Sequence, residues 1–287
     1  MAEIERVGVV GAGLMGSGIA EVSARSGLDV VVAEVNPAGL DAGRERLEKS
    51  LVRAVRSGKL SDEARESALS RLSFTLDLDD FADRDVVVEA VAEHEQVKVG
   101  VFERLDKVVT RPDAILASNT SSIPIMNLAM ATTRPSQVIG LHFFNPVPVL
   151  PLVELIPSLL SGEDTQRHAA AFASDVLGKT VVRCQDRAGF VVNALLVPFL
   201  LSAMRMLESG FASAEDIDSG MVAGCAHPMG PLRLSDLIGL DTLKAVADSM
   251  YEEFKEPLYS APPLLLRMVD AGLLGRKTGR GFFSYEH

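Results

Sequence analysis

Tryptophan is absent from the 287-residue sequence, and cysteine occurs only twice, at Cys184 and Cys225. The two cysteines lie far apart in the chain, and neither stands in a pattern of Cys and His residues that is typical of a zinc site. The sequence therefore indicates neither a disulfide framework nor a structural metal. We expect a chain that binds no metal.

Positive charge is also scarce. The chain has 28 Lys and Arg residues against 39 Asp and Glu residues, and its formal net charge is -11 at pH 7. Such an acidic surface argues against nucleic acid or an anionic membrane as a partner, because both would be repelled. It remains compatible with a local basic patch that binds one phosphorylated ligand.

Long hydrophobic runs are missing as well. The longest, residues 190–204, is interrupted by Asn193 and Pro198 and is shorter than the roughly 20 residues that span a bilayer. A strand pattern already begins at Arg6, which leaves no room for a signal or transit peptide. We therefore expect a cytoplasmic protein, whose 47% hydrophobic residues can form one large core or two moderate ones.

A glycine-rich loop is the first strong motif. The β-branched run Arg6–Val10 leads directly into G-A-G-L-M-G, and the helical pattern that follows ends at Gly27. This order of strand, loop and helix is typical of dinucleotide binding: the glycines allow a tight turn, approach of the pyrophosphate and close packing of helix on strand. The helix N-terminus then faces the phosphates. The candidate cofactor-binding residues here are Gly11, Ala12, Gly13, Leu14, Met15 and Gly16.

An acidic residue follows at the expected distance. A second strand pattern, Asp29–Ala33, ends at Glu34, which lies eighteen positions after Gly16. A carboxylate at this place hydrogen-bonds the hydroxyls of the adenosine ribose. No arginine follows in the next three residues, so a 2′-phosphate would meet only negative charge. The pattern therefore predicts NAD rather than NADP as the cofactor.

Further strand patterns alternate with helical stretches. They cover residues 72–75, 85–90, 114–118 and 138–141, and this alternation predicts a doubly wound parallel sheet. Ligands of such sheets bind beyond the carboxyl ends of the strands. The polar residues that follow these ends are Glu93, Lys98, Asn119, Thr120, Ser121, Ser122, His142 and Asn145.

A helical pair is inserted after the second strand. One helix is expected from Pro37 to Gly58 and another from an N-cap at Ser61 to about Leu72. Basic residues follow the first helix, and Arg44 and Arg46 are interpreted as part of a solvated face. The turn that carries Ser50, Arg53, Arg56 and Lys59 could instead hold a phosphorylated substrate handle.

The composition changes at residues 185–189, a polar break after which every segment has a helical pattern. We therefore predict an α/β fold, a Rossmann-type doubly wound parallel sheet with an inserted helical pair in residues 1–185, followed by an all-α domain in residues 186–287. The first helix of that domain, residues 190–208, is apolar on nearly all faces, which indicates burial partly against another subunit.

His142 and Glu154 form a candidate pair. His142 follows the apolar strand pattern 138–141, and Glu154 is a lone carboxylate within the apolar run Leu152–Ile156. A buried carboxylate needs a partner, and a histidine whose one ring nitrogen is held by a carboxylate can act as a base through the other. The alternative is that His142 is a hydrogen-bonded core residue and Glu154 a surface charge at a strand end.

Together these motifs resemble the short-chain L-3-hydroxyacyl-CoA dehydrogenases over nearly the whole chain. The resemblance is carried by the Gly11 loop and by six further segments: Val88–Val91, Ala117–Ser122, His142–Pro146, Gly189–Asn193, Pro228–Pro231 and Lys277–Gly279 with Gly281–Phe282.

The resemblance implies NAD-dependent interconversion of L-3-hydroxyacyl-CoA and 3-ketoacyl-CoA, with 3-hydroxybutyryl-CoA and acetoacetyl-CoA as the expected pair, in a homodimer held by the C-terminal helices. His142 would be the general acid and base and Glu154 its orienting partner, while Ser121 and Asn193 would bind substrate oxygens. The family pattern assigns further dinucleotide contacts to Glu34, Glu93, Lys98, Ser121, Asn145 and Lys277, and contacts on the CoA side to Ser50 and Lys98.

Two positions depart from the family pattern. The family has a second basic residue that contacts CoA, but this chain has Ser57 at that position. We expect a neighbouring basic residue, Arg53, Arg56 or Lys59, to take that role. The linker has Ala188 where many relatives carry proline, which should loosen the hinge.

Three other functions are compatible with a dinucleotide-binding fold. Lysine-dependent β-hydroxyacid dehydrogenases carry the catalytic lysine four residues before an asparagine, where this chain has Gly189, and they are excluded. A 3-hydroxyacyl group on an acyl carrier protein as substrate, and a non-catalytic NAD-binding protein, both remain open.

Overall fold

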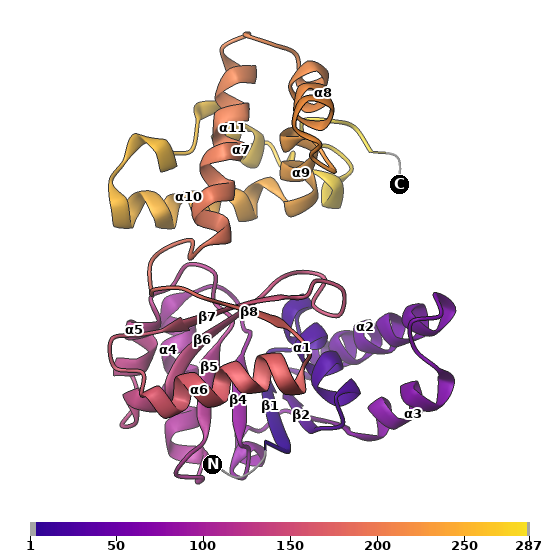
Figure 1. The fold of residues 1–287 in the computed structure, drawn as a ribbon, viewed down its shortest axis with the longest axis vertical. Coiled ribbons are helices and arrows are strands. Elements are labelled where there is room, and N and C mark those ends of the chain that lie inside the picture. The colour runs from indigo at the N-terminus through magenta and orange to yellow at the C-terminus, as the bar shows by residue number, and fades with distance from the viewer. Residues whose placement is uncertain (1–3, 286–287) are drawn as a thin grey trace. The chain divides into compact units, whose positions relative to one another are not determined.

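The computed structural model describes residues 4–285, which form two compact units that divide between Asp186 and Arg187 (Figure 1). The first unit contains one sheet of eight strands. They are β1 (Arg6–Val10), β2 (Asp29–Ala33), β3 (Leu72–Thr75), β4 (Val86–Glu89), β5 (Ile115–Ser118), β6 (Val138–Phe143), β7 (Leu152–Pro157) and β8 (Thr180–Arg183). Their order in the sheet is β3-β2-β1-β4-β5-β6-β7-β8.

The chain starts in the interior of the sheet at β1, winds to the edge at β3 and then returns to β4 on the other side of β1. This reversal produces the crevice in which doubly wound sheets bind ligands. The predicted α/β class with its doubly wound sheet is confirmed.

One pair of strands departs from the predicted parallel arrangement. Strands β6 and β7 run antiparallel, with His142 opposite Glu154 in the register. Their connection spans only residues 144–151, which is too short for the crossover that a parallel pair requires. All other neighbouring strands are parallel.

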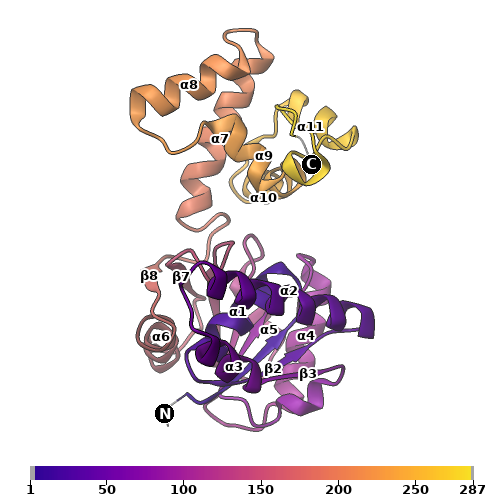
Figure 2. The same ribbon diagram turned by 90° about the vertical axis from the view of Figure 1, so that its right-hand side faces the viewer.

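Helices cover both faces of the sheet (Figures 1 and 2). Helices α1 (Leu14–Arg25) and α6 (Glu163–Ala171), with the π-helix η3 (Phe172–Val176), pack on one face in a continuous apolar core. Helices α4 (Glu95–Val108) and α5 (Ile125–Met130) lie on the opposite face. Because both faces are covered, the central strands β4, β5 and β6 are buried along their whole length.

The inserted helical pair is present as expected, as α2 (Pro37–Arg56) and α3 (Asp62–Ser70), which project at one side of the first unit in Figure 1. The side chain of Asn36 accepts a hydrogen bond from the Gly39 amide at 2.8 Å and caps α2. The Ser61 hydroxyl accepts from the Ala64 amide at 3.1 Å. The predicted N-cap of the second helix is therefore confirmed, since this bond satisfies one of its open amides.

The second unit has no strand among its described residues and is built from helices, as predicted. They are α7 (Val192–Glu208), α8 (Ala214–Cys225), α9 (Pro231–Ile238), α10 (Leu240–Phe254) and α11 (Pro263–Asp270). The buried Asp236 accepts hydrogen bonds from the amides of Phe282 and Phe283, each at 2.9 Å, and fixes the C-terminal segment to this core. No helix in the described part of the chain is long and apolar enough to cross a membrane.

Glycine is required where the first helix meets its strand. A Cβ atom at Gly16 would lie 1.8 Å from the carbonyl oxygen of Gly11, a contact that only a backbone shift could relieve. We expect Gly16→Ala to lower the thermal midpoint by roughly 6–10 °C, since overpacking of this kind costs about 3 kcal/mol. Thermal unfolding followed by circular dichroism measures it.

Gly100→Ala is the matched control. Gly100 is an exposed residue of α4, and a Cβ atom there would meet nothing within 4 Å. Alanine should raise the midpoint slightly or leave it unchanged, because it stabilises a helix by about 0.5–1 kcal/mol relative to glycine. Equal midpoints for the two variants would show that the close approach at Gly16 is not needed.

Candidate active site

The glycine-rich loop joins β1 to α1 at the carboxyl edge of the sheet. Gly11 has a φ of +99°, which favours glycine, and Gly13 is the N-cap of α1. A Cβ atom at Gly13 would meet nothing within 4 Å, so the surface above the loop is open. The amides of the first turn of α1 start beside this open surface, and a helix N-terminus attracts phosphate. The loop therefore fits the pyrophosphate of a dinucleotide.

Glu34 lies against this loop, at the end of β2. Its Oε2 accepts a hydrogen bond from the Ala12 amide at 3.0 Å, and its Oε1 accepts from the Val35 amide at 2.8 Å. The side chain is only partly buried. A carboxylate that is held beside the phosphate-binding loop and still reached by solvent is suited to accept hydrogen bonds from ribose hydroxyls.

A buried ion pair lies behind the strand ends. Lys98 of α4 is 1% exposed, and its Nζ lies 2.7 Å from Oε1 of the fully buried Glu89. The second oxygen of Glu89 accepts from the Ser118 hydroxyl at 2.7 Å. Loss of either charge would leave the other unpaired in the interior, which typically costs about 3–5 kcal/mol. The pair therefore ties α4 to the ends of β4 and β5.

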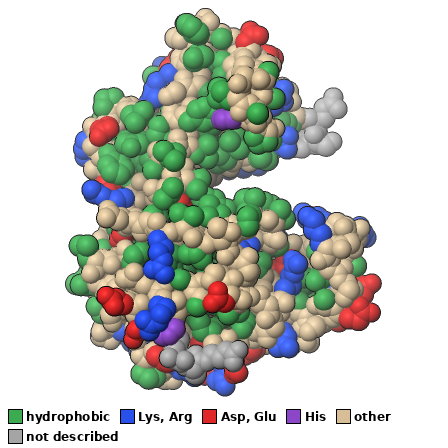
Figure 3. Space-filling view, viewed as in Figure 1, with side chains coloured by type: hydrophobic (Ala, Val, Ile, Leu, Met, Phe, Trp, Pro, Cys, Tyr) green, Lys and Arg blue, Asp and Glu red, His purple; other side chains and the backbone are tan. Residues whose placement is uncertain are grey.

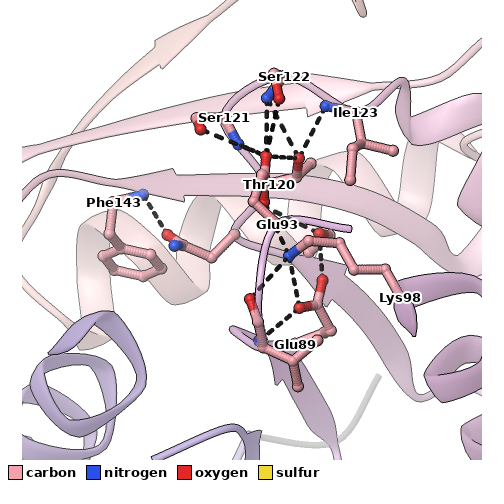
Figure 4. A network of polar contacts seen from close by, with 11 residues as sticks. Glu89, Glu93, Lys98, Thr120, Ser121, Ser122, Ile123 and Phe143 are labelled. Atoms are coloured by element: carbon pink, nitrogen blue, oxygen red, sulfur yellow. Dashed lines mark hydrogen bonds and ion pairs between the residues drawn. The ribbon is translucent and has the colours of Figure 1, made fainter. Parts of the chain in front are cut away.

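Glu93 extends this network toward the surface. Its Oε2 lies 3.2 Å from Nζ of Lys98, and its Oε1 accepts hydrogen bonds from Thr120, Ser121 and Ser122 (Figure 4). The amides of Ser121 and Ser122 donate at 2.9 and 3.1 Å. One carboxylate oxygen thus fixes the turn that presents the Ser121 side chain.

The same contacts determine the ionisation of Glu93. Burial alone would raise its pKa, but the charge of Lys98 and the hydrogen bonds from Thr120 and Ser121 outweigh that effect and lower the pKa below the ordinary 4.5. The carboxylate form is therefore the one that this turn requires.

His142 and Glu154 face each other across the antiparallel pair β6 and β7. Nδ1 of His142 lies 2.7 Å from Oε2 of Glu154, which is fully buried, while His142 is 7% exposed. The interpretation of Glu154 as a surface charge is therefore wrong. When the carboxylate accepts from Nδ1–H, the tautomer is fixed and Nε2 is the basic nitrogen. The ring also lies against Phe144, with centroids 4.6 Å apart.

One expectation near this pair needs correction. The strand was predicted to end at Leu141 with His142 beyond it, but β6 continues to Phe143. The reason lies in the partner strand, whose backbone pairs with His142 and Phe143 and keeps them extended. Asn119, which follows β5, accepts from the Phe143 amide at 2.9 Å and links the two strand ends.

Arg44 is exposed, as expected for a solvated face, whereas Arg46 is partly buried and departs from that expectation. Nη1 of Arg46 donates to the carbonyl oxygen of Ala12 at 2.7 Å, and the Arg44 guanidinium lies 4.7 Å from the ring centroid of Phe74. The Arg46 side chain turns back onto the glycine-rich loop, because α2 packs closely on Ala12 at Gly43. Charge patterning along one helix could not reveal these contacts.

The remaining site candidates are found at separate places. In the first unit, Asn145 is exposed in the loop after β6, while Ser50, Arg53 and Arg56 lie on α2, the two arginines being exposed. In the second unit, Asn193 lies in the first turn of α7, and Nζ of Lys277 lies 2.6 Å from Oδ2 of Asp241. Sequence reasoning assigned no site role to Glu89 or Arg46. A glutamate that ends an apolar strand, followed by a lysine nine residues later, was the available signal for Glu89.

The doubly wound sheet and its open glycine-rich loop define a dinucleotide-binding oxidoreductase, and comparison with known proteins gives the family. The model of the 3-hydroxyacyl-CoA dehydrogenase NAD binding domain matches residues 6–187, and that of the 3-hydroxyacyl-CoA dehydrogenase C-terminal domain matches residues 189–285. The chain belongs to the 3-hydroxyacyl-CoA dehydrogenase family, and NAD is its cofactor. The resemblance and the cofactor predicted from the sequence are thereby confirmed.

Individual relatives are similar over almost their full length. The 3-hydroxybutyryl-CoA dehydrogenase of Mycobacterium tuberculosis is 65% identical over 282 residues, which cover 98% of this chain and 99% of the relative. The crystal structure of M. tuberculosis FadB2 matches with a TM-score of 0.98 at 65% identity, over 99% of both chains. That of (S)-3-hydroxybutyryl-CoA dehydrogenase from Ralstonia eutropha matches with a TM-score of 0.94 at 44% identity, over 99% of this chain and 100% of that one.

The lowered pKa of Glu93 predicts a pH-dependent contribution to stability. A group whose pKa is lowered on folding stabilises the protein above its unfolded pKa, and this contribution is lost as the pH falls through the folded pKa. The difference in thermal midpoint between the native sequence and Glu93→Gln should therefore be constant near neutral pH and shrink below about pH 4.5. Thermal unfolding in a series of buffers measures it.

Glu103→Gln is the control for this series, because Glu103 is an exposed carboxylate on α4. Its midpoint difference should be small at every pH. If the Glu93→Gln difference stayed constant through the acid range, the ionised carboxylate would not be what holds the Ser121 turn.

Proposed function

We propose that this chain interconverts L-3-hydroxyacyl-CoA and 3-ketoacyl-CoA by hydride transfer to and from NAD, with 3-hydroxybutyryl-CoA and acetoacetyl-CoA as the substrate pair. The observation that carries this proposal is the buried contact of 2.7 Å between His142 and Glu154 in a sheet whose β1 loop fits a dinucleotide. The similar enzymes of M. tuberculosis and R. eutropha are named 3-hydroxybutyryl-CoA dehydrogenases, which supports the choice of substrate.

The chemistry divides between cofactor and protein. Bound NAD supplies the hydride acceptor. Nε2 of His142 takes the proton of the substrate hydroxyl during oxidation and returns it during reduction. The Glu154 carboxylate keeps Nδ1 protonated and stabilises the imidazolium that forms, and its burial strengthens this interaction because little water screens it.

Hydrogen bonds to the reacting oxygen come from Ser121 and Asn193. Donors that are fixed before the reaction stabilise developing charge without reorganisation. The contacts of Glu93 with the Ser121 turn, within hydrogen-bond distance at three successive residues, provide this fixation for Ser121. Asn193 stands in the first turn of α7, at the start of the helical unit.

NAD and CoA are bound by residues of opposite charge. NAD is held by the glycine-rich loop and Glu34, whose negative charge disfavours a 2′-phosphate. The further dinucleotide contacts are Glu93, Lys98, Ser121, Asn145 and Lys277. The CoA side is held by Ser50 with Lys98 and by the exposed arginines Arg53 and Arg56, which supply positive charge in a chain of net charge -11.

The second unit also mediates homodimer formation in this proposal. Large apolar side chains remain exposed on it, with Leu195 of α7 at 74% and Phe211 at 78% exposure. Figure 3 shows hydrophobic side chains over much of its visible face. Exposed apolar clusters of this kind are typical of subunit contacts.

Removal of the base tests the reaction. With acetoacetyl-CoA, we expect rapid oxidation of NADH and slow oxidation of NADPH. The absorbance of the reduced nicotinamide measures both rates. His142→Ala should lower kcat by about 10³-fold or more, because general acid and base catalysis contributes about 10²–10⁴-fold. Affinity for NADH, measured by its fluorescence, should stay nearly unchanged.

Glu154→Gln is the companion variant, since it keeps the shape of the side chain and removes its charge. It should retain nucleotide binding and lose turnover to a smaller extent than His142→Ala. Full turnover by His142→Ala would contradict the assignment of the base. A folded native protein that binds NADH but does not reduce acetoacetyl-CoA would instead favour a carrier-bound acyl substrate or a non-catalytic role.

A further inference from the structure

Arg46 connects the inserted helix α2 to the dinucleotide loop. Its Nη1 donates to the carbonyl oxygen of Ala12 at 2.7 Å and lies 3.4 Å from the hydroxyl oxygen of Ser17. The Ser17 hydroxyl donates to the same carbonyl at 2.9 Å. The carbonyl of one loop residue is therefore held by two side chains, one from α1 and one from α2.

Close packing of α2 on the loop makes this contact possible. A Cβ atom at Gly43 would lie 2.4 Å from Cβ of Ala12 and 2.8 Å from its carbonyl oxygen. Nearer the start of the helix, a Cβ atom at Gly39 would lie 2.8 Å from Cγ of Glu34. The first half of α2 thus rests on the loop and on its acidic residue, and Arg46 follows Gly43 by one helical turn on the same side.

The peptide groups of Ala12 are held from opposite sides. Its amide donates to Glu34 at 3.0 Å, whereas its carbonyl accepts from Arg46. Under the proposed function Glu34 also accepts from the ribose hydroxyls, through lone pairs that the amides of Ala12 and Val35 leave unused. The bond from Arg46 to the Ala12 carbonyl does not involve this carboxylate, so it holds the loop independently of the ribose contact.

We infer that Arg46 is a positioning residue of the NAD site, which fixes the Ala12 peptide so that the amides at the start of α1 stay oriented toward the dinucleotide phosphates. The inference deepens the proposed function and rests on its assignment of Glu34 to the ribose. The guanidinium also places positive charge close to the phosphate-binding loop, where it adds to the favourable potential of the helix N-terminus.

NADH binding tests this inference. Fluorescence titration without any acyl-CoA measures the Kd for NADH, so that a failure of the proposed reaction leaves the measurement intact. Arg46→Met keeps an unbranched apolar stem and removes the charge and the donors. We expect its Kd to rise about tenfold, because a loop that the guanidinium no longer holds must be ordered when NADH binds. The thermal midpoint without ligand should change by less than about 3 °C, because the Ser17 hydroxyl still satisfies the carbonyl.

Arg44→Met is the matched control. It removes the same charge from the same helix, but the Arg44 guanidinium lies over the Phe74 ring instead of the loop. Its Kd should stay within about twofold of the native value, as expected for a screened surface charge. Arg46→Lys restores the charge without the planar guanidinium and should give an intermediate Kd.

Turnover adds a second readout. With acetoacetyl-CoA and saturating NADH, Arg46→Met should keep kcat within about twofold while its KM for NADH rises with the Kd, because the residue acts on uniform binding of the cofactor. If Arg44→Met and Arg46→Met weakened NADH binding equally, the effect would come from the loss of a positive charge on α2 in general, and the inference would be overturned. An unchanged Kd for Arg46→Met, or a large fall in its ligand-free midpoint, would overturn it too.

Discussion

The antiparallel pairing of β6 with β7 is the constraint on which the candidate active site depends. It places His142 directly opposite Glu154 in the register, and it buries the carboxylate completely. A side-chain contact of 2.7 Å between directly paired residues needs no flexible loop to form it. A shift of one residue in the pairing of β6 with β7 would leave the two side chains on opposite faces of the sheet. The dyad therefore requires this register. The short connection 144–151 excludes a parallel crossover and so fixes the antiparallel direction of the pair.

Elsewhere in both units, carboxylates accept hydrogen bonds from pairs of backbone amides. Glu93 accepts from the amides of Ser121 and Ser122, and Asp236 accepts from those of Phe282 and Phe283. Asp186 accepts from two amides at the start of α5, and Asp218 does the same at the start of α9. Each of these groups lowers the cost of its own burial by replacing water with two directed donors. Part of the acidic character of the chain is therefore structural, and the net charge of -11 overstates the negative charge that a ligand meets.

Local sequence patterns correctly predicted features that depend on neighbouring residues, such as strand bounds and helix caps. The bounds of β2 and β3 agree with the predicted strands, and Ser61 caps α3 as expected, because strand alternation and capping depend on neighbouring residues. The antiparallel pair was not predicted, since the direction of β7 depends on a partner strand. Arg46 was placed on a solvated face for the same reason: its partner Ala12 is 34 positions away. Pairing of His142 with Glu154 could be anticipated only because a buried carboxylate requires a partner.

The ring tautomer of His142 is the most direct test of the account. In protein labelled with ¹⁵N at histidine, spectra in alkaline buffer distinguish a protonated Nδ1 from a protonated Nε2, and a His142→Gln spectrum identifies the signal among the five histidines. We predict that the proton resides on Nδ1, in a hydrogen bond that Glu154→Gln weakens, with Nε2 as the basic nitrogen. A proton on Nε2 in the native protein would contradict it, because the nitrogen assigned to take the substrate proton would then already carry one.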